Sequence, residues 1–362
     1  MRILDEAAIE AIAIGAAILG TGGGGNPYIG RLRCQQELKR GRQVRVVTLD
    51  ELPDDARVVA VGGIGAPVVG IEKIRQGEEC LRAMQALEQL TGAKMDAVIA
   101  FEMGGSNSMA PMVTAAQAGI PVVDADGMGR AFPELDMTTF SIYGHVSAPA
   151  AFADDKGNVT VVQAAASEKW VERIGRATAI AMGGSAGSAI APMSGAFLKR
   201  AAVPGTLTQA QLLGEAVLHA NRLHQNPVDM ICAREGGRRL FEGKIVDLQR
   251  RLEGGFARGE LTLEGFGQNT GERGEIVIQN EFLLFRRNGV VEAVVPDLIL
   301  VLDHDTGHAI TTEVLRYGQR CAVVGLPCHP LLRTPEALQV IGPAAFGIAD
   351  VAYRPLSSSQ PG

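Results

Sequence analysis

The chain has 362 residues, of which 46% are hydrophobic, 20% charged and only 4% aromatic, and its formal net charge is −6. This length allows two domains with their own cores, and the composition is that of a globular protein. The negative charge argues against a surface that binds nucleic acid or an anionic membrane. No run of 18 or more apolar residues occurs, so the sequence predicts no membrane span.

The N-terminal segment is apolar enough to be compared with a signal peptide, but acidic residues interrupt it. Asp5, Glu6 and Glu10 lie inside the apolar stretch, so the pattern instead predicts an amphipathic helix capped near Asp5. The five cysteines are odd in number and lack paired metal spacing, which fits a reducing compartment better than a disulfide scaffold. We therefore expect a cytoplasmic protein.

Helical and strand patterns alternate through the first part of the chain. After the first helix comes a glycine-rich turn at residues 20–28, and a polar helix is predicted near residues 29–40. Runs rich in β-branched residues predict strands at 43–49 and 57–65, and apolar residues at helical spacing predict a helix over 70–90. This alternation predicts a mostly parallel sheet that is covered on both faces.

The character of the sequence changes after about residue 165. Small residues dominate 182–196, which predicts a loop or a closely packed helix, and a strong helical pattern covers 206–224. From about 230 to 325, short β runs are separated by glycine-bearing turns, which predicts a small antiparallel sheet or barrel. We therefore divide the chain into an α/β domain at 1–165 and a C-terminal domain at 166–362.

Two of the predicted strands in the first domain end in acidic residues. One run ends at Glu102, and the next contains Asp124 and Asp126. Residues 104–118, between the two runs, predict a turn followed by a helix. If the strands are parallel neighbours, the three carboxylates meet at the carboxyl edge of the sheet, where open α/β sheets bind ligands.

These carboxylates have functional and structural interpretations. Converging carboxylates can bind a divalent metal ion, or they can raise one another's pKa and transfer protons. Alternatively, Asp124 or Asp126 caps a turn, and Arg130 neutralises one of them. We take Glu102, Asp124 and Asp126 as candidate catalytic residues and metal ligands. His145, which follows a turn glycine, is a further candidate base or ligand.

The polar loops nearby supply candidates for contact with a ligand. Asn107 and the residues before it lie where a strand turns into a helix, so they either attract a polar ligand group or serve as an ordinary helix cap. The glycine run 22–25 lacks the lysine of a Walker loop and the dinucleotide spacing, so we expect no nucleotide cofactor. Its glycines still indicate a close approach by another backbone or a ligand. An exposed loop is sufficient to explain Glu134 and Asp136.

A second polar cluster lies within residues 297–308 of the C-terminal domain. The β character around it and Gly307 disfavour a helical metal pair, so the segment predicts a polar hairpin tip. Whether the histidine and cysteine side chains of this domain join a site stays open at this point. The residues concerned are His304, His308, Cys328 and His329.

Several segments, in this order, resemble one bacterial and archaeal family. They are residues 22–28, 102–107, 124–135, 296–299, 306–307, 342–347 and 353–355. The chain resembles the S-methyl-thiohydantoin desulfurase-like family, and the resemblance spans nearly the whole chain.

The resemblance implies an N-terminal three-layer α/β domain and a C-terminal domain that carries a β-barrel. It also implies hydrolytic release of methanethiol from an S-methylated thiohydantoin ring, and association with hydantoinase-like and oxoprolinase-like proteins. In such a reaction the three carboxylates hold a divalent metal or activate water, and Arg130 meets developing negative charge. The candidate substrate contacts are Gly24, Gly25, Asn26, Asn107, Arg130, Asp297 and Thr306.

Two other functions stay open. The chain could be a non-catalytic partner of a hydantoinase-type enzyme, in which case the acidic residues are structural. It could also be an amidohydrolase or isomerase that acts on another cyclic amide. The glycine-rich loops and apolar composition are compatible with a homodimer, and we expect no nucleic-acid or membrane partner.

Overall fold

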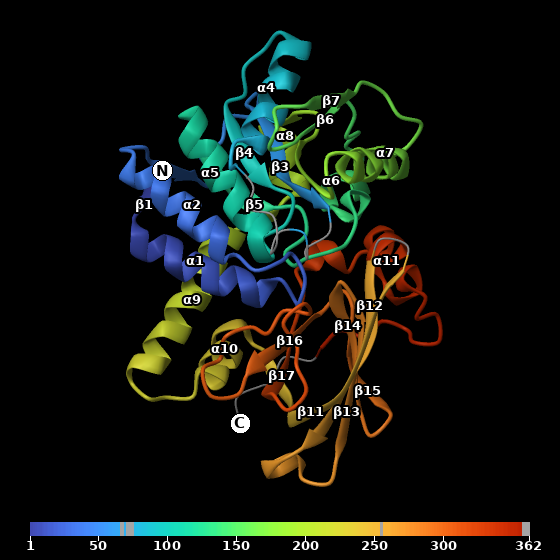
Figure 1. The fold of residues 1–362 in the computed structure, drawn as a ribbon. Coiled ribbons are helices and arrows are strands. Elements are labelled where there is room, and N and C mark those ends of the chain that lie inside the picture. The colour runs from blue at the N-terminus through green and yellow to red at the C-terminus, as the bar shows by residue number, and fades with distance from the viewer. Residues whose placement is uncertain (66–68, 70–75, 254–255, 357–362) are drawn as a thin grey trace.

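The structure is a computed structural model that describes residues 1–65, 69, 76–253 and 256–356. Two sheets organise it, one in each half of the molecule as drawn in Figure 1. Sheet A is mixed and carries helices on both faces, whereas sheet B is antiparallel and curls into a half-barrel. This arrangement confirms the predicted α/β fold with a β-rich C-terminal region.

Sheet A has the strand order β1-β2-β5-β4-β3-β8-β6-β7. Strands β2, β5, β4 and β3 are parallel, while β8, β6 and β7 continue the sheet in antiparallel fashion. The predicted neighbours β4 and β5 pair directly, with α5 between them in the chain. The strands are β1 (Arg2–Leu4), β2 (Val44–Val47), β3 (Arg57–Gly65), β4 (Ala97–Ala100), β5 (Val122–Asp126), β6 (Ala150–Ala153), β7 (Val159–Val162), β8 (Ser185–Ala189), β9 (Met193–Ser194) and β10 (Val203–Pro204).

Two helical layers cover sheet A. Helices α1, α2, α4, α5 and α9 share one hydrophobic cluster with the sheet, and α6, α7 and α8 share another. In the described ranges, no helix combines the length and hydropathy that a membrane span needs. The helices are α1 (Glu6–Leu19), α2 (Tyr28–Lys39), α4 (Glu79–Thr91), α5 (Met109–Ala118), α6 (Thr139–Ile142), α7 (Glu168–Ala181), α8 (Gly195–Ala201), α9 (Thr206–Arg222), α10 (Pro227–Glu235) and α11 (Pro335–Ile341).

Most predicted helices form where the pattern placed them. Asp5 caps α1, since its carboxylate accepts a hydrogen bond from the Ala8 N–H at 2.8 Å. The helix predicted over 70–90 is present as α4, while residues 70–75 lie outside the described part of the chain.

The prediction of a loop or helix at 182–196 is wrong, because this segment supplies a strand. Strand β8 is buried along its whole length and inserts between β3 and β6. A Cβ at Gly187 would lie 2.5 Å from the backbone nitrogen of Cys80 in α4. The small residues therefore let helix α4 pack directly on strand β8. The composition of the segment indicates close packing, but it does not distinguish a strand from a helix or a loop.

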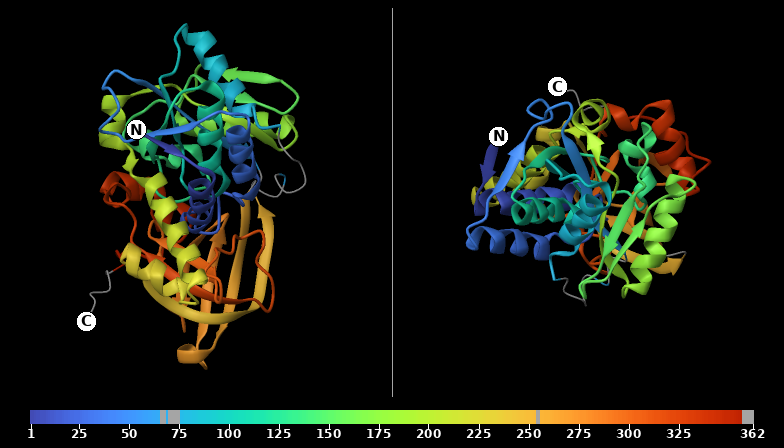
Figure 2. Two further views of the ribbon diagram at one scale, coloured as in Figure 1. Left: turned by 90° about the vertical axis from the view of Figure 1, so that its left-hand side faces the viewer. Right: turned by 90° about the horizontal axis from the view of Figure 1, so that it is seen from above.

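Sheet B has the order β15-β14-β13-β12-β11-β17-β16, and all its neighbouring strands are antiparallel. Figure 2 shows its long strands extending away from sheet A. Alternate residues such as Leu261, Leu263, Ile276 and Ile278 fill its interior. The strands are β11 (Arg238–Glu253), β12 (Phe256–Gly265), β13 (Arg273–Gln279), β14 (Glu281–Arg287), β15 (Val290–Val294), β16 (Leu298–Asp303) and β17 (Arg320–Leu326).

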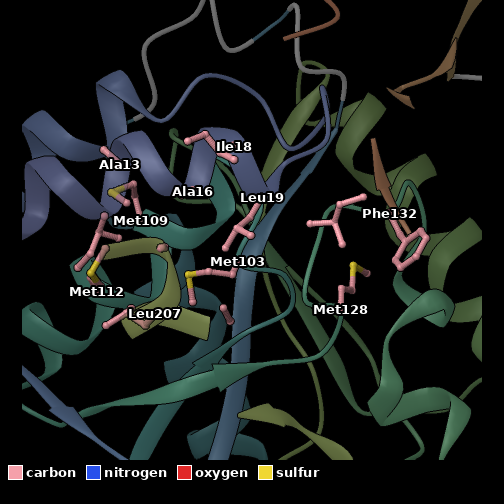
Figure 3. Close-up of a cluster of buried hydrophobic side chains, with 14 of the residues drawn as sticks. Ala13, Ala16, Ile18, Leu19, Met103, Met109, Met112, Met128, Phe132 and Leu207 are labelled. Carbon is pink, nitrogen blue, oxygen red and sulfur yellow. The ribbon is translucent and has the colours of Figure 1, made fainter. Parts of the chain in front are cut away.

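One hydrophobic cluster joins the two halves of the molecule. It continues from sheet A into Leu283, Leu284 and Leu298 of sheet B. Helix α1 approaches α9 so closely that a Cβ at Gly15 would lie 1.8 Å from the carbonyl oxygen of Ala210. Figure 3 shows the part of the cluster around α1, with Ala13, Ala16, Ile18, Leu19, Met103, Met109, Met112, Met128, Phe132 and Leu207.

Arg130 is completely buried where the two halves meet. Its guanidinium lies over the ring of Phe132, with 4.8 Å between the Cζ atom and the ring centroid. Burial lowers the pKa of Arg130 to about 10, so the group stays a cation at neutral pH. It donates hydrogen bonds to Thr21 Oγ1 (2.9 Å) and to the carbonyl oxygens of Ala131 (3.2 Å), Phe282 (3.3 Å), Pro296 (3.2 Å) and Asp297 (2.8 Å).

We predict that Arg130→Met lowers the free energy of unfolding by at least about 3 kcal/mol, because it leaves several buried carbonyl oxygens without a donor. Chemical denaturation measures this difference. Arg273→Met, at an exposed side chain of sheet B, is the matched control and should change stability little. Equal stability of Arg130→Met and the wild type would contradict the role assigned to Arg130.

Candidate functional site

A cavity of about 450 Å³ lies between the carboxyl edge of sheet A and the start of β14 in sheet B. Its wall includes the glycine loop at Gly24 and Gly25, the strand end at Glu102, the amide of Asn107, and Glu281. This volume is suitable for a small organic molecule. The location agrees with the general position of ligands in open α/β sheets.

Glu102 follows β4 and is 5% exposed. Its Oε1 accepts a hydrogen bond from Asn107 Nδ2 at 2.6 Å, and its Oε2 accepts one from the Phe132 N–H at 3.2 Å. Burial raises the pKa of Glu102 to about 8, and the charge of Asp126 adds to this effect, while the two hydrogen bonds and Arg130 oppose it. Glu102 is therefore a carboxyl group that can change protonation state near neutral pH.

Asn107 fixes the orientation of Glu102. Its Oδ1 accepts a hydrogen bond from the Gly63 N–H at 2.8 Å, which points Nδ2 at the carboxylate. The amide therefore connects the end of β3 to the end of β4. Asn26 also lines the cavity, and its Oδ1 accepts the N–H of Tyr28 at 2.9 Å, at the start of α2.

The glycine run lies against other backbones, as the sequence predicted. Ser106 donates from its N–H and its hydroxyl to the carbonyl oxygen of Gly24, at 2.9 and 2.8 Å. A Cβ at Gly24 would lie 2.4 Å from the carbonyl oxygen of Gly104. Gly24 and Gly25 thus line the cavity and also make contacts with the turn that precedes α5.

Glu281 was missed by the sequence analysis. It begins β14, is 2% exposed and lines the cavity. Burial raises the pKa of Glu281 well above its ordinary value; the charges of Glu102 and Glu313 raise it further, and Arg130 opposes them. The only signal in the sequence is a single acid directly before the apolar run of a strand, and nothing local connects it to Glu102.

Asp126 is fully buried but lies behind the cavity wall. Its Oδ2 accepts the Met103 N–H at 2.5 Å, and both its oxygens lie 3.0 Å from the Gly129 nitrogen. Burial raises the pKa of Asp126 to about 7, and these backbone donors oppose the shift. Asp126 therefore shapes the loop that carries Arg130.

Asp124 faces helix α9 instead of the cavity. Its carboxylate accepts the Thr208 N–H at 2.9 Å and the Thr208 hydroxyl. It thereby satisfies a free donor in the first turn of α9 and places a negative charge at the helix N-terminus. Asp124 therefore has structural partners, but at the start of α9 and not in the turn that the sequence suggested.

The three carboxylates do not form a common metal-ligand set in this arrangement. Backbone or Thr208 donors occupy Asp124 and Asp126, and only Glu102 lines the cavity. Among the residues that the structure describes, no group of three His, Cys, Asp or Glu residues could hold a metal ion. A bound divalent metal therefore stays a prediction, and we build no step on it.

Glu134 lines the cavity and Asp136 is buried, so the expectation of an exposed loop at these two residues is wrong. His145, Thr306 and His304 lie away from the cavity wall. His145 Nε2 lies 3.0 Å from the carbonyl oxygen of Ala191, and burial lowers its pKa. Thr306 donates its hydroxyl to Asp303 at 2.7 Å in an exposed hairpin. In the same hairpin, the Nδ1 atom of His304 lies 2.8 Å from Asp305.

Asp297 holds the C-terminal segment. Its Oδ1 accepts from the Cys328 N–H at 2.9 Å and from the Tyr353 hydroxyl at 3.1 Å, and its Oδ2 accepts from the Leu356 N–H at 2.7 Å. It is completely buried and is absent from the cavity wall. Arg130 is likewise behind the wall, so its contacts are with protein oxygens.

We predict that Asp124→Ala lowers the free energy of unfolding by about 1–2 kcal/mol, as expected for the loss of a helix cap. Thermal or chemical denaturation measures the change, with Asp55→Ala at an exposed position as the control. If Asp124→Ala is as stable as the control, the capping role is wrong.

Comparison with known proteins places the chain in a family. Residues 7–164 match the S-Me-THD-like N-terminal domain, and residues 166–356 match the S-Me-THD-like C-terminal domain. The chain belongs to the S-Me-THD-like family. This confirms the resemblance seen in the sequence motifs.

The boundary between the two S-Me-THD-like domains does not coincide with the boundary between the two sheets. Strands β8, β9 and β10 lie within the C-terminal match, yet all three pair with strands of sheet A. The two domains are therefore joined by shared strands as well as by side-chain contacts.

A solved structure has the same overall architecture as this S-Me-THD-like chain. It is an X-ray crystal structure of a protein from Chromobacterium violaceum, determined by the Northeast Structural Genomics Consortium. The two chains are 26% identical, the match covers 99% of this chain and 100% of that chain, and the TM-score is 0.82. A comparison with curated proteins gives no match.

Proposed function

We propose that this S-Me-THD-like protein is an enzyme that hydrolyses an S-methylated thiohydantoin ring and releases methanethiol. The observation that carries the proposal is that Glu102 and Glu281, two buried carboxyl groups whose pKa burial raises, line one small-molecule cavity. The name of the family supplies the substrate class, since it refers to S-methyl thiohydantoins.

The environments of the two carboxyl groups suit opposite roles in proton transfer. Glu102 receives two hydrogen bonds, which favour its ionised form, whereas Glu281 Oε2 has no partner within the described residues. The charge of Glu102 also favours the protonated form of Glu281. We therefore assign Glu102 as the base and Glu281 as the acid.

In the proposed reaction, Glu102 takes a proton from water, and the hydroxide adds to the ring carbon that carries the S-methyl group. Glu281 supplies the proton that the ring nitrogen carries once the carbon–nitrogen double bond has become single. The tetrahedral intermediate then returns its hydroxyl proton to Glu281 and forms a carbonyl. The carbon–sulfur bond breaks, and methanethiolate takes the proton from Glu102. One water is consumed, and both carboxyl groups regain their starting states.

Asn107 acts as a positioning residue in this scheme. Its Nδ2 is 2.6 Å from Glu102 Oε1, so it orients the base and stabilises the ionised form. This assignment replaces the direct contact with substrate that the sequence suggested for Asn107. The wall formed by Gly24, Gly25 and Asn26 is left to contact the remainder of the ring.

A thiol-release assay with an S-methyl thiohydantoin tests the proposal. We expect Glu102→Gln to lower kcat at least ~100-fold, as for loss of a general base. Because the base must be ionised, kcat/KM of the wild type should rise as the pH increases through about 8. Glu260→Gln, an exposed carboxyl of sheet B, should keep wild-type turnover.

Two results would contradict the proposal. Full turnover by folded Glu102→Gln would remove the base. Absence of thiol release from the purified wild type would favour a non-catalytic partner of a hydantoinase-type enzyme, or, if a separate assay detects ring opening, a cyclic-amide hydrolase.

A further inference from the structure

Three of the carboxyl groups that line the cavity come from separate parts of the chain. Glu102 comes from sheet A, Glu281 begins β14, and Glu313 follows β16 in the chain. The charges of Glu102 and Glu313 both act on Glu281, so each of them disfavours an ionised Glu281. A ligand that brings positive charge to this wall would relieve the repulsion.

Arg130 does not supply this charge by direct contact. Its hydrogen bonds go to Thr21 Oγ1 and to four backbone carbonyl oxygens, which together use the five N–H donors of a guanidinium. In the described chain, no ion pair joins Arg130 to Glu102, Glu281 or Glu313. The charge of Arg130 therefore acts on Glu281 without a direct ion pair, from a position outside the cavity lining.

One side-chain oxygen of Glu281 has no hydrogen-bond partner among the described residues. The side chain is 2% exposed, it lines the cavity, and its Oε2 has no hydrogen bond from any described residue. A Cβ at residue 23 would lie 2.1 Å from Glu281 Oε1, so Gly23 provides the space that this carboxyl group occupies. A buried polar atom of this kind is complementary to an N–H donor of a ligand.

We propose that Glu281 and Glu102 bind the ring as a cation, and that the site selects cyclic amidine-type ligands, namely cyclic isothioureas and cyclic guanidines. This inference rests on the proposed function where it concerns the S-methyl substrate. On binding, the proton of Glu281 moves to the basic ring nitrogen, which leaves a carboxylate paired with a ring cation. The cation makes the ring carbon a better target for water. Atoms and charge balance, because only one proton is transferred.

The same pairing favours release of the product. A hydantoin has a carbonyl where the substrate has the S-methyl group, so its ring lacks the basic nitrogen. It therefore remains neutral and cannot form the ion pair with Glu281. The wall thus distinguishes substrate from product by charge and not by size.

Calorimetric titration with two rings of matched size tests this inference. The probes are 2-aminoimidazol-4-one, a cyclic guanidine, and hydantoin, its neutral counterpart. We expect the wild type to bind the cyclic guanidine at least tenfold more tightly than hydantoin. Glu281→Gln should lose this preference, while Glu260→Gln should keep it. Equal affinities of the wild type for the two rings would overturn the inference.

The two proposals can fail separately. Thiol release without preference for the cyclic guanidine would overturn the cation site and leave the desulfurase function standing. Preference for the cyclic guanidine without thiol release would support the ligand class and overturn the desulfurase function. If Glu281→Gln does not fold, the comparison of both rings with wild-type protein still decides the matter.

Discussion

A guanidinium buried between two sheets needs oxygen acceptors from both, and this requirement organises the molecule around Arg130. Its acceptors include Thr21 in the glycine loop and the carbonyl oxygens of Phe282 and Asp297 on the sheet B side. These bonds fix the start of β14 relative to the carboxyl edge of sheet A. They also position one wall of the cavity, because Glu281, which lines it, immediately precedes Phe282 in the chain.

The glycine loop allows the close approach that this arrangement requires. The Phe282 N–H donates to the carbonyl oxygen of Thr21 at 2.8 Å, and Thr21 adopts a positive φ of 49°, which is uncommon for a β-branched residue. A Cβ at Gly22 would lie 2.5 Å from the Phe282 ring. The loop can therefore meet β14 only because residue 22 has no side chain. This contact positions the start of β14, and with it Glu281, at the cavity.

Local patterns in the sequence were sufficient for the architecture and for placing one carboxyl group, Glu102, at the candidate site. The acid at the end of a β run predicted Glu102 correctly as a residue at the sheet edge, since β4 and β5 are parallel neighbours. The orientation of Asp124 could not be predicted, because it depends on where α9 begins. Glu281 could not be predicted either, since its position depends on docking of sheet B. The orientation of Asp124 and the position of Glu281 both depend on contacts between residues that are far apart in the chain.

Carbon-13 NMR of the glutamate side-chain carboxyls, titrated with pH and assigned with Glu102→Gln and Glu281→Gln, measures most directly whether two buried acids share this cavity. The account predicts that Glu102 titrates near pH 8 and that Glu281 stays protonated at pH values well above those of exposed glutamates. Titration of both groups at the ordinary value of exposed glutamates would contradict it, because neither could then act as the proposed acid or base.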